Sequence, residues 1–211
     1  MKLLAKKIGD TFEEQKFYYL IVLLFFCVGV VIGVYAIKYM NITDRQDLTG
    51  YYSNFIESVQ SNNINYGSLL LGIFKKNMIL IIPIILLGFT FFGSPIILII
   101  NLLKGFSIGY TFTFLLTMFE GNGLALAIGS LVPQNIIYIP CIVATSIIAL
   151  SLSTIKFKEK FIKKMPIKNL LLNKGGTNIL LLVLCIFIIG MIIEAYLSPM
   201  LVKLIITKFY L

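Results

Sequence analysis

The sequence predicts an all-α integral membrane protein, a single polytopic domain with about five transmembrane helices. Of its 211 residues, 59% are hydrophobic and 13% are charged, and a soluble domain of this size could not bury so much apolar surface. The apolar residues are gathered in runs long enough to cross the roughly 30 Å hydrocarbon core of a bilayer as helices. Lysines cluster beside these runs, as in cytoplasmic loops of membrane proteins. We therefore expect the lipid bilayer to surround the chain.

The residue inventory argues against several classes of function. The chain contains no histidine, which removes histidine-based catalysis and most zinc sites. Cys27, Cys141 and Cys185 lie inside apolar runs, and three thiols cannot pair completely. The net charge of +9 comes from lysines next to apolar spans, so nucleic acid is not expected as a partner. We expect no catalytic residues, no metal and no cofactor.

The amino-terminal segment is expected to begin in the cytoplasm and to cross the membrane once. Residues 1–16 have apolar side chains at helical spacing among lysines, which predicts an amphipathic lead-in at the membrane surface. Residues 17–37 form the first predicted span. This span contains Gly29 and Gly33, a small-xxx-small pair for which packing within the bundle is the expected use.

Residues 38–77 form a polar loop that we expect outside the cell, with an amphipathic helix at 48–60 and a short helical piece at 68–74. Apolar residues of the first helix recur at offsets of three and four, so they share one face. Tyrosine enrichment suits the membrane interface, and docking of a partner protein is the alternative use of this face. Leu48 is the first apolar residue of this face. The candidate partner-binding residues on it are Tyr51, Tyr52, Phe55, Ile56 and Val59.

The second and third predicted spans, residues 78–92 and 95–118, meet at the tight turn Gly93-Ser94-Pro95. Proline has no N–H and disfavours helix at the residue before it, but it fits the first turn of a new helix. Within the third span, Gly105 and Gly109 form a second small-xxx-small pair. A polar stripe on this span serves either to join helices or to line a wet cavity; its residues are Asn101, Lys104, Ser107 and Thr111.

The apolar stretch from residue 124 to 155 is too long for one simple crossing, because a span needs roughly 20 residues. Pro133, Gln134 and Asn135 interrupt it with groups that need partners inside the protein. We expect a broken or re-entrant half-helix at 124–132 and a fourth span at 136–153. The polar break is either a hydrogen-bonded plug or a substrate-coordinating site.

The last third of the chain sets the expected orientation. Residues 156–176 are rich in lysine, which predicts a cytoplasmic loop. Residues 177–197 form the fifth predicted span, with Glu194 near its far end, and residues 198–211 are expected as an external tail. The amino terminus is then cytoplasmic and the carboxyl terminus outside. On these bounds, no acidic residue lies near the middle of a span.

Several segments of the chain together resemble stage II sporulation protein M. They are Lys75-Lys76-Asn77, Gly88, Gly93-Ser94-Pro95, Asn101, the KGFSIGY segment at 104–110 and the LVPQN segment at 131–135. Many broader relatives have a histidine after the proline of the last motif and an acidic residue soon after. Gln134 and Tyr138 stand here instead, which makes a charged-site mechanism unsafe to carry over.

The resemblance implies a role in endospore formation, at the mother-cell septal and engulfing membrane. It implies a non-enzymatic scaffold that anchors and assembles septal peptidoglycan hydrolases, the stage II sporulation proteins D and P, for septal thinning and engulfment of the forespore. The alternative is a small membrane channel or transporter subunit that uses Lys104, the break at Pro133 and Glu194. The glycine pairs would also permit a homodimer. The candidate packing and assembly positions are Gly88, Gly93, Pro95, Asn101, Lys104, Gly105, Gly109, Pro133, Gln134 and Asn135.

Overall fold

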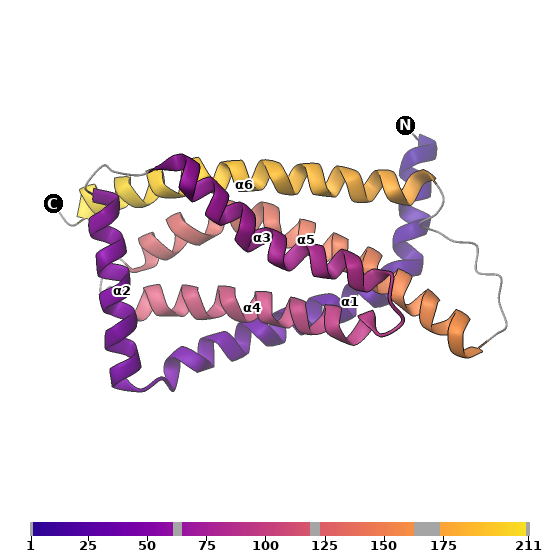
Figure 1. Cartoon of the computed structure of the whole chain (residues 1–211), viewed down its shortest axis with the longest axis horizontal. Helices are drawn as coiled ribbons and strands as arrows, with labels where there is room; N and C mark the ends of the chain where they lie inside the picture. The colour runs from indigo at the N-terminus through magenta and orange to yellow at the C-terminus, as the bar shows by residue number, and fades with distance from the viewer. Residues whose placement is uncertain (1, 61–64, 119–122, 163–173, 210–211) are drawn as a thin grey trace.

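The computed structural model describes residues 2–60, 65–118, 123–162 and 174–209, nearly all of which are helical. The helices of these ranges are shown in Figure 1. Five contain stretches long and apolar enough to cross a membrane, which confirms the predicted fold class. The helices are α1 (Lys2–Lys38), α2 (Ile42–Gln60), α3 (Tyr66–Gly88), α4 (Gly93–Met118), α5 (Gly123–Ile162) and α6 (Lys174–Phe209). The candidate spans are Lys16–Lys38, Tyr66–Gly88, Gly93–Thr117, Gly123–Lys158 and Asn178–Ile205.

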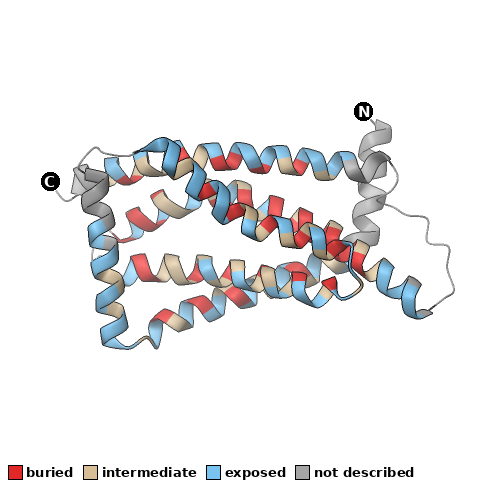
Figure 2. Cartoon of the chain, in the orientation of Figure 1, coloured by how far each residue is buried: buried red, intermediate tan, exposed pale blue. Residues whose placement is uncertain are grey.

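Helix α5 is the centre of the bundle. It packs against α1, α3, α4 and α6, and 67% of its most apolar window is buried, compared with 22–28% for the other spans. The outer helices show buried positions along one side and exposed positions along the other (Figure 2). The exposed sides carry many leucine, isoleucine and valine residues. Such a surface suits contact with lipid, because bilayer hydrocarbon is as apolar as these side chains.

The predicted break in the fourth span is wrong, because α5 is one helix from Gly123 to Ile162 with Pro133 and Pro140 inside it. The half-helix expected at 124–132 is its amino-terminal part, which runs at an angle to the rest in Figure 1. Proline bends a membrane helix without ending it when neighbouring helices and side chains satisfy the backbone groups. Close packing on four helices gives α5 this support.

The outer helices are longer than the sequence predicted. Helix α2 begins at Ile42 rather than at residue 48. The predicted pieces at 68–74 and 78–92 belong to one helix, α3, which ends at Gly88. Asn65 caps α3, because its side-chain oxygen accepts hydrogen bonds from the N–H groups of Gly67 and Ser68, at 3.1 and 3.3 Å. This cap satisfies two of the N–H groups that a helix start leaves unpaired.

Helix α6 also extends past its predicted end. The tail expected at 198–211 continues the fifth span as helix as far as Phe209, with Pro199 inside it. At the amino terminus the lead-in expected at 1–16 is helical from Lys2. Of the basic loop expected at 156–176, residues 156–162 continue α5 and residues 174–176 begin α6. The rest of this loop, residues 119–122 and the last two residues lie outside the described residues. The orientation of the termini across the membrane stays a prediction.

Candidate functional site

Helices α1 and α4 meet at four glycines, two from each helix. Gly29 and Gly33 of α1 are buried against the backbone of α4, and Gly105 and Gly109 of α4 are buried against the backbone of α1. A methyl group at Gly29 would overlap the carbonyl oxygen of Leu102, and each of the other three would likewise overlap a backbone carbonyl. Small residues allow such close approach in membranes. Packing within the bundle is confirmed for both pairs, so these glycines are not the surface of a homodimer.

The turn between α3 and α4 is fitted closely to α5. A side chain at Gly88 would lie 2.9 Å from the Cα atom of Ala149, and Gly93 is buried at the start of α4. The Ser94 hydroxyl donates a hydrogen bond to the Ser153 hydroxyl at 3.1 Å. Gly88 and Gly93 are therefore packing positions, as predicted. Pro95, in the first turn of α4, is exposed.

The predicted polar stripe of α4 divides into two parts. Asn101 is fully buried, and its amide nitrogen donates to the Ser146 hydroxyl of α5 and to the Ile97 carbonyl, both at 2.8 Å. The hydroxyl of Thr111 instead donates to the carbonyl of Ser107 in its own helix at 2.8 Å. Interhelical hydrogen bonds of this kind stabilise membrane bundles by about 1 kcal/mol. Asn101 therefore joins α4 to α5.

A cluster of polar side chains lies inside the bundle where α3, α4, α5 and α6 meet. Tyr138 donates a hydrogen bond of 2.5 Å to Oε2 of Glu194. The amide nitrogen of Asn77 lies 3.3 Å from the Tyr138 hydroxyl and 3.4 Å from the same Glu194 oxygen. Lys104 Nζ lies 5.7 Å from the centre of the Tyr138 ring. We call Asn77, Lys104, Tyr138 and Glu194 the central polar cluster.

The central polar cluster combines an ammonium and a carboxylate with two neutral hydrogen-bonding groups. Asn77 and Tyr138 are 3% and 2% exposed, and Glu194 and Lys104 are half-buried. Lys104 lies over the face of the Tyr138 ring, and the hydroxyl of that ring bonds Glu194, so both charges belong to one cluster. Charged groups inside a membrane are costly unless they are paired, hydrated or hydrogen-bonded. The cluster therefore gives these charges polar surroundings, and its hydrogen bonds join α3 to α5 and α6.

Sequence reasoning found part of this cluster and misplaced another part. It identified Lys104 but placed Glu194 near the end of a span. Because α6 continues to Phe209, Glu194 lies well inside the span Asn178–Ile205. The prediction that no acidic residue lies near the middle of a span is therefore wrong. Opposite charges in two spans were the signal that could have paired Lys104 with Glu194. Asn77 and Tyr138 were noted only in the family resemblance, and neither was predicted to contact these charges.

The polar residues at the predicted break have separate partners. Gln134 accepts a hydrogen bond of 2.6 Å from the Ser198 hydroxyl of α6. The Asn135 amide nitrogen donates to the Leu131 carbonyl in its own helix at 2.8 Å, and its buried oxygen has no hydrogen-bond partner among the described residues. Pro133 is half-buried in the preceding turn. The Gln134 bond closes the bundle between α5 and α6.

Helix α2 stands across one end of the bundle (Figure 1). Leu48 packs against a buried cluster that includes Ile37 and Phe114, so this side of α2 is attached to the bundle. Tyr51 is 73% exposed. At the start of the candidate partner-binding face, Leu48 is therefore packed on the bundle and Tyr51 is exposed. The side chains of its other members lie outside the described residues; these are Tyr52, Phe55, Ile56 and Val59.

The comparison with protein families gives one match. The family model described as Stage II sporulation protein M matches residues 22–199, which contain the glycine contact and the central polar cluster. The searches of curated proteins and of solved structures gave no significant match. With five helices able to cross a bilayer, this multi-pass membrane protein belongs to the stage II sporulation protein M family, which gives it a role in sporulation.

Proposed function

We propose that the protein is a non-enzymatic membrane scaffold that anchors and assembles septal peptidoglycan hydrolases, the stage II sporulation proteins D and P. It acts in the mother-cell septal and engulfing membrane, during septal thinning and engulfment of the forespore. The family match supports the sporulation part of this proposal. The observation that supports the scaffold part is helix α2, which stands across one end of the bundle (Figure 1) and exposes Tyr51 of the predicted docking face.

The polar groups of the bundle support a structural role rather than chemistry. Asn101 joins α4 to α5, and Gln134 joins α5 to α6. The central polar cluster ties α3 to α5 and α6 through its hydrogen bonds. The described residues contain no group of three potential metal ligands, and the chain has no histidine to act as a base. These contacts join α3, α4, α5 and α6 into the bundle that α2 crosses at one end.

We expect Tyr51→Asp to reduce recovery of the two wall hydrolases about tenfold. An exposed tyrosine on a docking surface is a typical binding hot spot, and its loss costs at least about 1.4 kcal/mol of binding free energy. The measurement is a pull-down of the tagged protein from sporulating cells in mild detergent, with quantitative mass spectrometry of co-purifying proteins. The variant Phe55→Asp/Val59→Asp extends the test along the predicted face and is expected to have a larger effect.

The matched control is Phe157→Asp, the same kind of change at an exposed aromatic residue of α5. Phe157 lies near the carboxyl end of that helix, at the end of the bundle away from α2 (Figure 1). This variant is expected to recover the hydrolases normally. Unchanged recovery with both α2 variants, at normal membrane levels of the protein, would contradict docking on α2.

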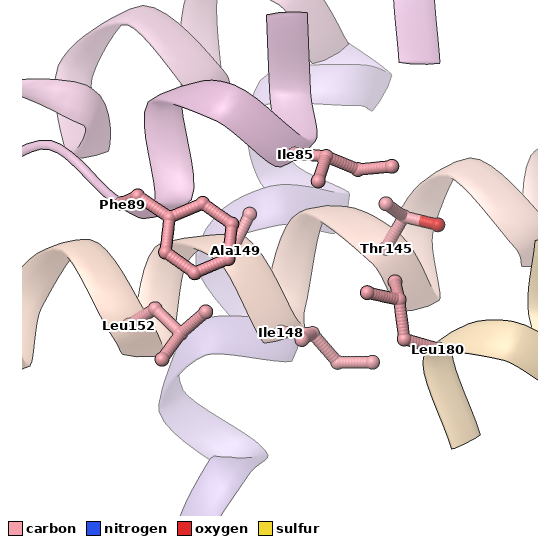
Figure 3. Close-up of a pocket in the computed structure, with 7 residues that line it drawn as sticks. All are labelled: Ile85, Phe89, Thr145, Ile148, Ala149, Leu152 and Leu180. Atoms are coloured by element: carbon pink, nitrogen blue, oxygen red, sulfur yellow. The ribbon is translucent and has the colours of Figure 1, made fainter. Parts of the chain in front are cut away.

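The alternative, a small channel or transporter subunit, is favoured by the charges of the central polar cluster inside the membrane. Its test is a substrate-dependent flux in proteoliposomes that Lys104→Ala abolishes. The pocket in Figure 3, between α3, α5 and α6, is separate from this cluster and has a volume of about 20 Å³, which is room for one water molecule. Its lining is mainly apolar, and the Thr145 hydroxyl within it donates to the Cys141 carbonyl at 2.8 Å. This pocket is no route for a solute.

A further inference from the structure

Aromatic rings and lysines gather where the carboxyl end of α5 passes the turn between α3 and α4. The ring centres of Phe157 and Phe161 are 4.8 Å apart, and Phe91 of the turn lies 6.3 Å from Phe161. Lys160 Nζ is 3.4 Å from the centre of the Phe91 ring. In Figure 1 this end of α5 extends beyond the turn. We call this surface the basic–aromatic end; it consists of Phe91, Phe92, Lys156, Phe157, Lys158, Lys160 and Phe161.

The rings of the basic–aromatic end are exposed although they are large and apolar. Phe92, Phe161 and Phe157 are 61%, 59% and 42% exposed. Lys158 and Lys160 are exposed as well. With about 100° of rotation per residue, the two α5 rings lie between Lys160 on one side and Lys158 on the other. The surface therefore presents apolar rings bordered by positive charges.

The two ends of the bundle differ in charge. Next to α2, the cations Lys38 and Arg45 lie close in the chain to the acids Asp44 and Asp47. At the end of α5, residues 156–160 contain three lysines and a single acid, Glu159. A surface with excess positive charge attracts anions at its own end of the bundle. The charge between residues 38 and 47 is balanced, so the same attraction is not expected there.

The basic–aromatic end lies at the end of a candidate membrane span. The candidate span of α5 ends at Lys158, between Phe157 and Phe161. Aromatic rings favour this position, and lysines next to a span attract anionic lipids. We propose that the basic–aromatic end binds the phosphate headgroups of anionic phospholipids, with the phenylalanine rings at the boundary between headgroups and acyl chains.

The chain contains no tryptophan, so one introduced tryptophan is a clean fluorescent reporter. The full-length Phe161→Trp protein is reconstituted into phosphatidylcholine vesicles that contain an equal fraction of either brominated phosphatidylcholine or brominated phosphatidylglycerol. Bromine quenches tryptophan on contact, and the two degrees of quenching give a relative binding constant. We expect phosphatidylglycerol to be preferred at least threefold, and the preference to fall below half of that value when Lys158 and Lys160 are both replaced by glutamine.

The matched control is Tyr39→Trp, a reporter just after the end of α1, beside the charge-balanced segment. Tyr39 is 75% exposed, so lipid can reach it, and we expect nearly equal quenching by the two lipids. A second control adds 0.5 M salt, which should weaken the preference of the Phe161→Trp protein because charge attraction is screened.

Equal quenching of the Phe161→Trp reporter by the two lipids would overturn the proposal. A preference that survives both lysine substitutions would overturn it too. If the basic–aromatic end binds an acidic protein instead of lipid, the two lipids should quench the Phe161→Trp reporter equally.

Discussion

Replacing Gly105 by leucine is expected to separate α1 from α4 and to lower the stability of the protein. A side chain at this position would overlap the backbone carbonyl of Phe26. Backbone atoms cannot rotate aside as side chains do, so the helices must move apart. Forcing extra atoms into a packed contact costs about 1–3 kcal/mol, and we expect about 3 kcal/mol here because the displaced atoms are backbone. The measurement is the midpoint of unfolding in mixed detergent, followed by circular dichroism.

Gly72→Leu is the matched control for this prediction. Gly72 lies in α3 and is exposed, and outside its own helix backbone no atom of the described residues lies within 4 Å of an added Cβ. The substitution adds the same side chain to another membrane helix, so it should leave the midpoint within the error of the parent protein. A Gly105→Leu protein with the parent midpoint would show that α1 and α4 do not pack through these glycines. Gly29→Leu tests the same contact from the other helix and should behave as Gly105→Leu does.

Glu194→Gln is expected to lower the free energy of unfolding by about 2 kcal/mol, because it leaves Lys104 without its balancing charge inside the membrane. Glutamine keeps the size of the side chain and can still accept a hydrogen bond from Tyr138. The change therefore removes charge and little packing. Lys104→Met should destabilise the protein for the converse reason. In the double variant, the loss of unfolding free energy should be smaller than the sum of the two single losses by at least about 0.5 kcal/mol.

The measurement for the charge pair is a double-mutant cycle with the same mixed-detergent unfolding assay. Lys75→Met is the matched control for Lys104→Met, since Lys75 is exposed on α3. It should change the free energy of unfolding by less than about 0.5 kcal/mol. Strictly additive losses in the double variant would show that Lys104 and Glu194 do not interact across Tyr138, and the central polar cluster would then consist of Asn77, Tyr138 and Glu194.

The sequence by itself determined the class of this protein and the location of its close helix contacts. The number of spans follows from the apolar runs, because a bilayer requires a minimum helix length whatever the tertiary arrangement. The glycine pairs on α1 and α4 are also local signals, and both pack within the bundle as predicted. The third span was predicted almost to its bounds, because Gly93 and Pro95 punctuate the chain at its start.

Helix continuity was decided by the tertiary structure. Pro133 with Gln134 and Asn135 locally predicts a break, yet α5 passes through it as helix. The α5 helix is packed among four others, and the polar side chains at this point find partners there: Gln134 accepts from Ser198, and Asn135 donates to the Leu131 carbonyl. The depth of Glu194 likewise depended on how far α6 continued, and Pro199 did not end it.

The central polar cluster also depended on the fold, because its residues are far apart in the chain. Asn77 and Tyr138 are 61 positions apart, and Asn77 and Glu194 are 117 positions apart. The spacing of apolar residues in the sequence does not indicate which helices pack together, because lipid-facing and protein-facing apolar residues look alike in a membrane sequence. The sequence by itself therefore determined that the chain spans the membrane and where two of its helices approach closely. Only the packing of the other helices around α5 decided which polar groups meet inside the bundle.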